Sequence, residues 1–146
     1  MGSFTDDLKR FERKTAGKMD QVGRKVSLDM FRNVIDKTPV DLGGAQANWQ
    51  ASLGSPASGT LDEVDKIGDR TKAKAKAVVA TAKAGDTIYL ANNLPYIMRL
   101  EEGGYGDGPK TVGGFSIQLA AGGMVALTVQ EFAATVKRIG LEISRQ

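Results

Sequence analysis

The chain has 146 residues, of which 41% are hydrophobic and 25% charged, and its formal net charge is +3. These values are typical of a soluble globular chain that can bury a core, so residues 1–146 are expected to form a single domain. Because cysteine and histidine are both absent, disulfides, thiolate or imidazole metal sites and Ser-His or Cys-His catalytic pairs are excluded. The sequence has no apolar run of about eighteen residues and no signal-peptide core, so we expect neither membrane insertion nor export.

Residues 1–37 predict a long N-terminal helix. Apolar side chains recur at steps of three or four from Phe4 to Ile35, which is one face of a helix. Thr5 is expected to cap its start, and Thr38–Pro39 to end it.

The length of this helix is itself informative. At ~1.5 Å per residue it would reach roughly 45–50 Å, which is long for a chain of 146 residues. Gly17 and Gly23 disfavour helix, so a bend or break near them is the alternative to one straight element. Such a helix is expected to project from the body or to pack against a neighbour.

The next segment predicts a strand and a second helix. Residues 48–54 indicate a strand, although the first of them could finish a helical turn, and Trp49 is expected to anchor the core. A helix is expected from Thr60 or Asp62 to about Ala84, with Val64 and the apolar residues that follow it at helical spacing on its inner face.

The outer face of that second helix is basic. A solvated surface is one interpretation, and a face turned toward DNA phosphates is the other, with Lys72, Lys74 and Lys76 as the residues that would face DNA. No aromatic residues alternate with the lysines, so base stacking is not expected.

Residues 86–105, DTIYLANNLPYIMRLEEGGY, form the most distinctive stretch. A short β run at 87–90 is followed by Asn92–Asn93, residues that favour turns. Pro95 fits the first position of a short helix, and Gly103 fits its end. An ordinary strand–helix connection in a core is the plain alternative.

The rest of the chain predicts an extended loop and a last helix. Residues 103–122 are rich in glycine and contain a β run at 115–119. The segment GYGDGPKT within them is rejected as a phosphate-binding loop, because Pro109 precedes the lysine and no helix follows. Residues 123–144 predict a helix whose apolar seam lies on the domain's own core or pairs with another subunit. The expected seam residues are Val125, Val129, Phe132, Val136, Ile139 and Ile143.

The order NNLPY followed by LEEG resembles the neck or tail-completion proteins of long-tailed, siphovirus-type bacteriophages. The resemblance extends from Val40 to the C-terminus, including Val40–Gly43 and Gly123–Val125. It implies a structural virion protein at the head–tail junction, made in the host cytoplasm and assembled as a six- or twelve-fold ring around packaged DNA. The partners it implies are the connector, head-closure and tail-terminator proteins.

The same resemblance implies where subunits and neighbouring rings would meet, namely at the short helix and the extended loop. Glu101 is expected to make an inter-subunit polar contact, with substitutions there leaving the monomer folded, whereas Tyr96 is expected to pack beneath the turn. The implied interface residues are Asn93, Pro95, Tyr96, Leu100, Glu101, Gly103, Tyr105 and Phe115.

The predicted fold class is α+β: a small antiparallel sheet packed by a long N-terminal helix, a middle helix and a C-terminal helix, with a long glycine-rich loop. No enzyme, metal or cofactor is expected, because the clustered carboxylates Glu101, Glu102 and Asp107 match no known catalytic or cation-binding spacing. A tail-terminator or head-closure ring remains an alternative, and a non-specific DNA-binding protein is an alternative of another class.

Overall fold

The computed structural model describes residues 3–105, 108, 110–112, 115–116, 118 and 122–146. In chain order its elements are α1 (Phe4–Lys37), α2 (Gly44–Ala47), β1 (Gln50–Leu53), α3 (Asp69–Val79), β2 (Ile88–Ala91), α4 (Ile97–Glu102), β3 (Thr111–Val112), β4 (Phe115–Ser116), α5 (Met124–Gln130) and α6 (Phe132–Ser144). The α+β prediction is confirmed.

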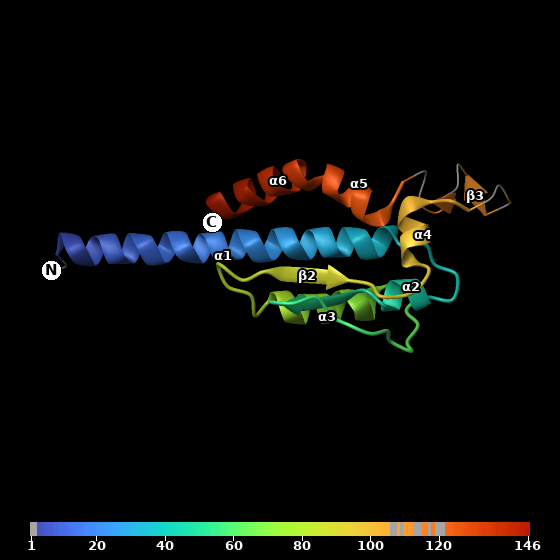
Figure 1. Ribbon diagram of the computed structural model, residues 1–146. Coiled ribbons are helices and arrows are strands. Elements are labelled where there is room, and N and C mark those ends of the chain that lie inside the picture. Colours follow the sequence, from blue (N-terminus) through green and yellow to red (C-terminus); the bar gives the residue numbers. More distant parts are fainter. Residues whose placement is uncertain (1–2, 106–107, 109, 113–114, 117, 119–121) are drawn as a thin grey trace.

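The long helix α1 is the middle layer of the molecule (Figure 1). Helices α5 and α6 cover one side of it, and the β1–β2 sheet with α3 covers the other. The strands β1 and β2 pair antiparallel, from Gln50 opposite Ala91 to Leu53 opposite Ile88. A second pair, β3 with β4, joins Thr111 to Ser116 and lies beyond α4.

Helix α1 is one continuous helix that passes through both glycines and runs straight in Figure 1, so the alternative of a bend or break is wrong. Its cap is Ser3 rather than Thr5: the Ser3 hydroxyl accepts from the Asp6 amide at 3.2 Å, while the Ser3 amide donates to the Asp6 carboxylate at 3.3 Å. This reciprocal pair satisfies two donors at once, which a single hydroxyl at Thr5 would not. The helix ends at Thr38, as predicted.

Only the second half of α1 belongs to the body. Residues 3–17 are all exposed and extend past the end of α6, as the left of Figure 1 shows. We call residues 4–17 the arm.

Replacing Gly23 by alanine should raise the free energy of unfolding by about 0.5–1 kcal/mol, because glycine costs that much within a helix. A Cβ added at Gly23 meets no atom within 4 Å, so no clash offsets the gain. Urea unfolding followed by far-UV circular dichroism measures it. Gly43→Ala is the opposite control, since Gly43 has φ +90 and its Cβ would stand 2.8 Å from the Asp65 backbone nitrogen.

The prediction for the first strand and its tryptophan is confirmed in part. Strand β1 begins at Gln50, and Asn48 instead ends the short helix α2, which was the stated alternative. Trp49 is 7% exposed and lies in the main core. That core joins α1, α2, α4 and α5, and its buried residues are Val34, Ile35, Ala45, Trp49, Ile97 and Met124.

The middle helix is shorter than predicted at both ends. It begins at Asp69, and the residues before it form a loop in which Val64 and Ile67 are 58% and 75% exposed. Gly68, with φ 89, turns the chain into the helix. A residue with left-handed backbone angles interrupts an α-helix, so α3 cannot extend to residues before Gly68. Neither Thr60 nor Asp62 is therefore its cap.

The end of α3 is tied to α1 by side chains. The Asp20 carboxylate accepts from the Ala84 amide at 2.8 Å, and the Arg24 guanidinium donates to the Ala82 carbonyl at 3.0 Å. These bonds hold the turn after Val79 against α1, so the chain leaves the helix before Ala84.

The predicted last helix is two helices with a break at Glu131. The Glu131 carboxylate pairs with Lys37 at 3.0 Å and accepts from the side-chain nitrogen of Asn33 at 3.4 Å, so α1 holds the junction. Beyond the break, Ile139 and Ile143 pack on Val26 of α1.

The first half of the expected seam is wrong. Met124 and Thr128 are the buried residues of α5, whereas Val125, Val129 and Phe132 are 40%, 57% and 48% exposed. The change of direction at the junction therefore leaves the first half of the predicted seam uncovered.

Candidate functional site

The turn after β2 is fixed by its two asparagines. The Asn92 side chain donates to the Ala45 carbonyl at 2.8 Å and accepts from the Leu94 amide at 3.2 Å. Asn93 donates to the carbonyls of Ala57 and Gly59 at 2.9 and 3.0 Å. Asn93 therefore joins this turn to the loop that follows β1.

Helix α4 begins at Ile97 rather than at Pro95, which lies in the preceding turn. Ile97 is buried, and Leu100 packs against the main core from a partly buried position. Tyr96 is 45% exposed, so the expectation that it packs beneath the turn is wrong. Met98 is 57% exposed, so α4 presents an apolar side chain to solvent as well as to the core.

Glu101 is engaged within its own chain. Its carboxylate accepts from the amides of Val125 and Ala126 at 3.0 and 2.8 Å, which are donors in the first turn of α5 that have no partner within that helix. Gly123 makes this possible, because a Cβ there would lie 2.4 Å from the Glu101 carbonyl oxygen. Glu101 therefore helps to hold α5 within its own chain, so a substitution there is expected to lower the stability of the subunit. That the variant still folds, and that Glu101 makes a contact between subunits, stay predictions.

The extended loop leaves α4 through Gly103, which is buried and has φ 81. Tyr105 lies under Arg99, whose guanidinium carbon is 5.0 Å from the ring centre, a cation–π distance. Phe115 is half-buried in β4. The predictions for residues 106–107, 109, 113–114, 117 and 119–121 of the loop, including part of the β run at 115–119, lie outside the described residues.

Gln118 fixes the loop to the end of α1. Its amide oxygen accepts from the Val40 amide at 2.7 Å, and its amide nitrogen donates to the Val40 carbonyl at 3.0 Å. The predicted interface residues are thus gathered at one end of the molecule, where α4, β3 and β4 meet (Figure 1).

The three lysines proposed to face DNA do not share one face. Lys72 and Lys76 line a shallow hollow of about 450 Å³ together with Arg32 of α1 and with Asp69. Lys72 is paired with Asp36. Lys74, two residues from each, points elsewhere and pairs with Glu63 at 2.7 Å, as expected from about 100° of rotation per helical residue.

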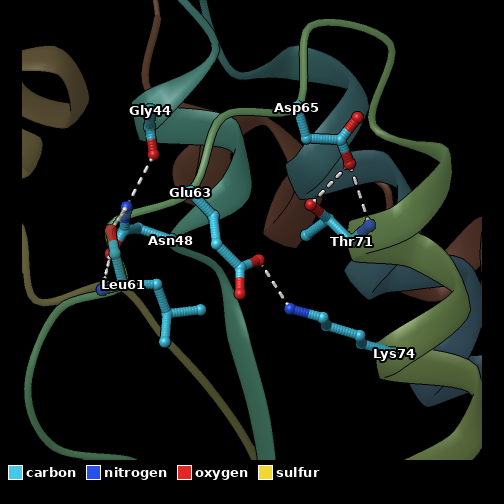
Figure 2. A network of polar contacts seen from close by, with 7 residues as sticks. All are labelled: Gly44, Asn48, Leu61, Glu63, Asp65, Thr71 and Lys74. Atoms are coloured by element: carbon cyan, nitrogen blue, oxygen red, sulfur yellow. Dashed lines mark hydrogen bonds and ion pairs between the residues drawn. The ribbon is translucent and has the colours of Figure 1, made fainter.

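A polar network holds the loop before α3, and Figure 2 shows its members except Gly68. Asn48 donates to the carbonyls of Gly44 and Leu61 at 2.8 and 3.0 Å, and its oxygen accepts from the Leu61 amide at 2.7 Å. Asp65 accepts from the amide and hydroxyl of Thr71 at 2.9 and 2.8 Å, and from the Gly68 amide at 2.9 Å. Asp65 therefore supplies the cap that the sequence assigned to Thr60 or Asp62.

These bonds make Asp65 sensitive to pH. Burial acts to raise the pKa of its carboxyl, but the bonds from Thr71 and Gly68 outweigh burial and hold the pKa below its ordinary value of 3.8. A depressed pKa contributes stability above the ordinary value, and this contribution is lost as the pH falls through the folded value. Asp65→Asn should therefore lower the free energy of unfolding by about 0.5–2 kcal/mol at neutral pH, the range for removal of a cap.

The measurement is urea unfolding of the wild type and of Asp65→Asn, from neutral pH to below 3.8. The difference between the two proteins should shrink as the pH falls through that range. A difference that stays constant with pH would mean that the ionised carboxylate is not what holds the loop.

The structure leaves two apolar surfaces uncovered. The first lies on the arm, where Phe4, Leu8 and Phe11 are 77%, 46% and 67% exposed. The second, which we call the α5 patch, is formed by Val125 and Val129 of α5 and by Phe132, the first residue of α6. The exposed arm agrees with the expectation that so long a helix projects from the body or packs against a neighbour. The exposure of the second surface was not predicted, because the break at Glu131 has no local sequence signal.

The described part of the chain offers no group of three or more acidic residues placed to hold a metal ion. Nor does any helix within it have the length and apolar character needed to cross a bilayer. Comparison with known proteins finds no family model, no curated protein and no solved structure that matches this chain.

Proposed function

We propose that this protein is a structural subunit of a ring at the head–tail junction of a long-tailed bacteriophage, where it joins or completes the tail around the DNA channel. In this role it would work by packing against copies of itself and against neighbouring connector, head-closure and tail-terminator proteins.

The observation that carries the proposal is the arm. Residues 4–17 are all exposed and have no packing partner among the described residues, yet they carry three large apolar side chains on one face of α1. Uncovered apolar surface of this kind marks an interaction site. A subunit that acts by assembly accounts for it directly.

Support also comes from residues 92–103, on which the resemblance to neck proteins rests. The turn after β2 and helix α4 are held by side-chain bonds to three other parts of the chain, through Asn92, Asn93 and Glu101. This makes the α4 end a rigid surface that exposes Tyr96 and Met98, 45% and 57% accessible. Rigid, partly apolar surfaces suit contacts between pre-formed subunits.

The test is depletion of the protein during phage assembly, followed by electron microscopy and complementation. We expect DNA-filled heads and finished tails to accumulate separately, and to join when the protein is restored. Normal joined particles without the protein would overturn the proposal. Met98→Lys, a change at an exposed position, should fail to restore joining, whereas Glu102→Lys serves as the matched exposed control.

A second candidate is non-specific DNA binding through the basic hollow, since Arg32, Lys72 and Lys76 converge on one surface. Removing a lysine that binds a phosphate should reduce the salt dependence of binding, so Lys72→Gln with Lys76→Gln should lower the slope of log affinity against log salt by roughly two. Lys74→Gln is the matched control and should change the slope little. Equal effects of both variants would rule out the hollow as the DNA-binding surface.

A further inference from the structure

We infer that the arm of one subunit binds the α5 patch of a second copy of this chain, in a head-to-tail contact. The inference goes beyond the proposed function in naming the two surfaces, and it depends on that function only for the closure of the contacts into a ring.

The arm's apolar face continues a seam that the chain already buries. Further along α1, Val22, Val26 and Met30 pack against Val136, Ile139 and Ile143 of α6. Helix α6 ends at Ser144, and the same face of α1 then runs on toward Phe4 without cover (Figure 1). A helix of the same character as α5–α6 would extend this packing along the arm.

The α5 patch is the exposed first half of the C-terminal apolar seam that runs from Val125 to Ile143. Val125, Val129 and Phe132 follow one another at steps of four and three, the same spacing as Phe4, Leu8 and Phe11. All six side chains are at least 40% exposed. Within one chain, the part of the α1 seam after the arm packs on the second half of the C-terminal seam. The arm and the α5 patch, which are the first parts of the two seams, stay exposed.

The arm can contact an α5 patch only on a second copy of the chain. The arm points away from the body at the end where α6 finishes, and α5 lies toward the other end of α1 (Figure 1). The arm therefore does not reach the α5 patch of its own chain. Because the two surfaces differ, the contact is heterologous, and contacts of this type build rings or open chains rather than closed pairs.

Arm-to-arm pairing is the competing arrangement and explains less. It would cover Phe4, Leu8 and Phe11 but would leave the α5 patch exposed on both copies. It would also stop at a dimer, because an isologous contact uses the same surface on both partners.

One such contact is small. Stable interfaces bury about 1,200–2,000 Å², and three phenylalanine side chains with their aliphatic neighbours supply only part of that area. A free subunit is therefore expected to associate weakly, and closure of a ring, which gives each subunit two contacts, would be needed to hold it.

Cysteine cross-linking tests the inference without needing a tight complex, because the chain has no cysteine of its own. The Leu8→Cys protein is mixed with the Val129→Cys protein at the highest soluble concentration and treated with a short bismaleimide. We expect a covalent heterodimer as the main product. The double variant L8C/V129C should give a ladder of higher oligomers.

The matched control is Arg13→Cys mixed with Val129→Cys. Arg13 is two residues after Phe11, about 200° around the helix, so it points away from the apolar face. Its cross-linked yield should be about tenfold lower, the ratio that about 1.4 kcal/mol of contact free energy produces. Equal yields from the two arm positions would overturn the inference, and so would a product dominated by Leu8→Cys homodimers, which would establish arm-to-arm pairing.

The outcome separates the inference from the proposed function. If the ladder forms but the protein does not join heads to tails, the arm contact stands and the neck role fails. If the protein joins heads to tails but L8C/V129C gives no ladder, the neck role stands and the arm contact is wrong.

Discussion

Replacing Trp49 by alanine is expected to lower the free energy of unfolding by about 3–5 kcal/mol, the range for removing a large aromatic side chain from a packed core. Trp49 is 7% exposed and lies among Ile35, Ala45 and Met124. It packs where α1, α2 and α5 meet, so the space left behind cannot close without moving several elements.

Part of this effect comes from a buried polar chain. The Trp49 indole nitrogen donates to the Thr38 hydroxyl at 2.7 Å, and that hydroxyl donates to the Val34 carbonyl at 2.8 Å. Trp49→Phe keeps most of the ring packing but removes the donor, so it should cost about 0.5–1.5 kcal/mol for the missing bond in addition to a smaller packing loss.

Because Trp49 is the single tryptophan, unfolding of these variants must be followed by far-UV circular dichroism in urea rather than by fluorescence. Leu42→Ala is the control, since Leu42 is 69% exposed and should change stability by less than about 0.5 kcal/mol. A Trp49→Ala effect no larger than that of Leu42→Ala would contradict the placement of Trp49 at the centre of the core.

The second large effect is expected at Glu101. Removing its carboxylate with Glu101→Ala takes away two charge-assisted bonds to the start of α5, at 3.0 and 2.8 Å. Bonds to charged groups contribute about 1.5–3 kcal/mol each when buried, and less here because Glu101 is partly exposed. A total loss of about 2–3 kcal/mol is expected on this basis.

Glu102 is the matched control, because it is the adjacent glutamate and is exposed. The bonds to the α5 amides are made by Glu101. Glu102→Ala should shift the urea midpoint little. Similar shifts from the two variants would mean that Glu101 does not hold α5. The result also decides how assembly experiments are designed, since a Glu101 variant would disturb the subunit as well as its contacts.

The sequence could predict the features that depend only on residues close to one another in the chain. The apolar period of α1 repeats over most of its length, and Thr38–Pro39 ends it by local rules. The turn at Asn92–Asn93 and the glycine at the end of α4 also follow from local preferences. These features were therefore found without knowledge of the tertiary contacts.

What it could not predict is decided by residues distant in the chain. Thr60 and Asp62 are as good local caps as Asp65, but it is Asp65 whose amide is bound to the Gly43 carbonyl, at 2.9 Å. Asn33 and Lys37, both on α1, hold the break at Glu131. In each case tertiary contact chose among several locally acceptable structures.

The exposure of the α5 patch follows from one of these distant contacts. The C-terminal seam is continuous in sequence, with steps of four and three from Val125 to Ile143. Because the chain changes direction at Glu131, the second half of this seam lies on α1, whereas α5 packs on α1 through Met124 and leaves the first half of the seam exposed. A surface that is apolar but uncovered is then available for a second subunit.

The most direct measurement is the mass of this protein free in solution and of the complex that contains it when released from purified phage particles. The account predicts a monomer or a weak, concentration-dependent association in solution, and a ring of fixed copy number in the particles. Absence of the protein from joined particles would contradict the account and would leave DNA binding through Arg32, Lys72 and Lys76 as the function to pursue.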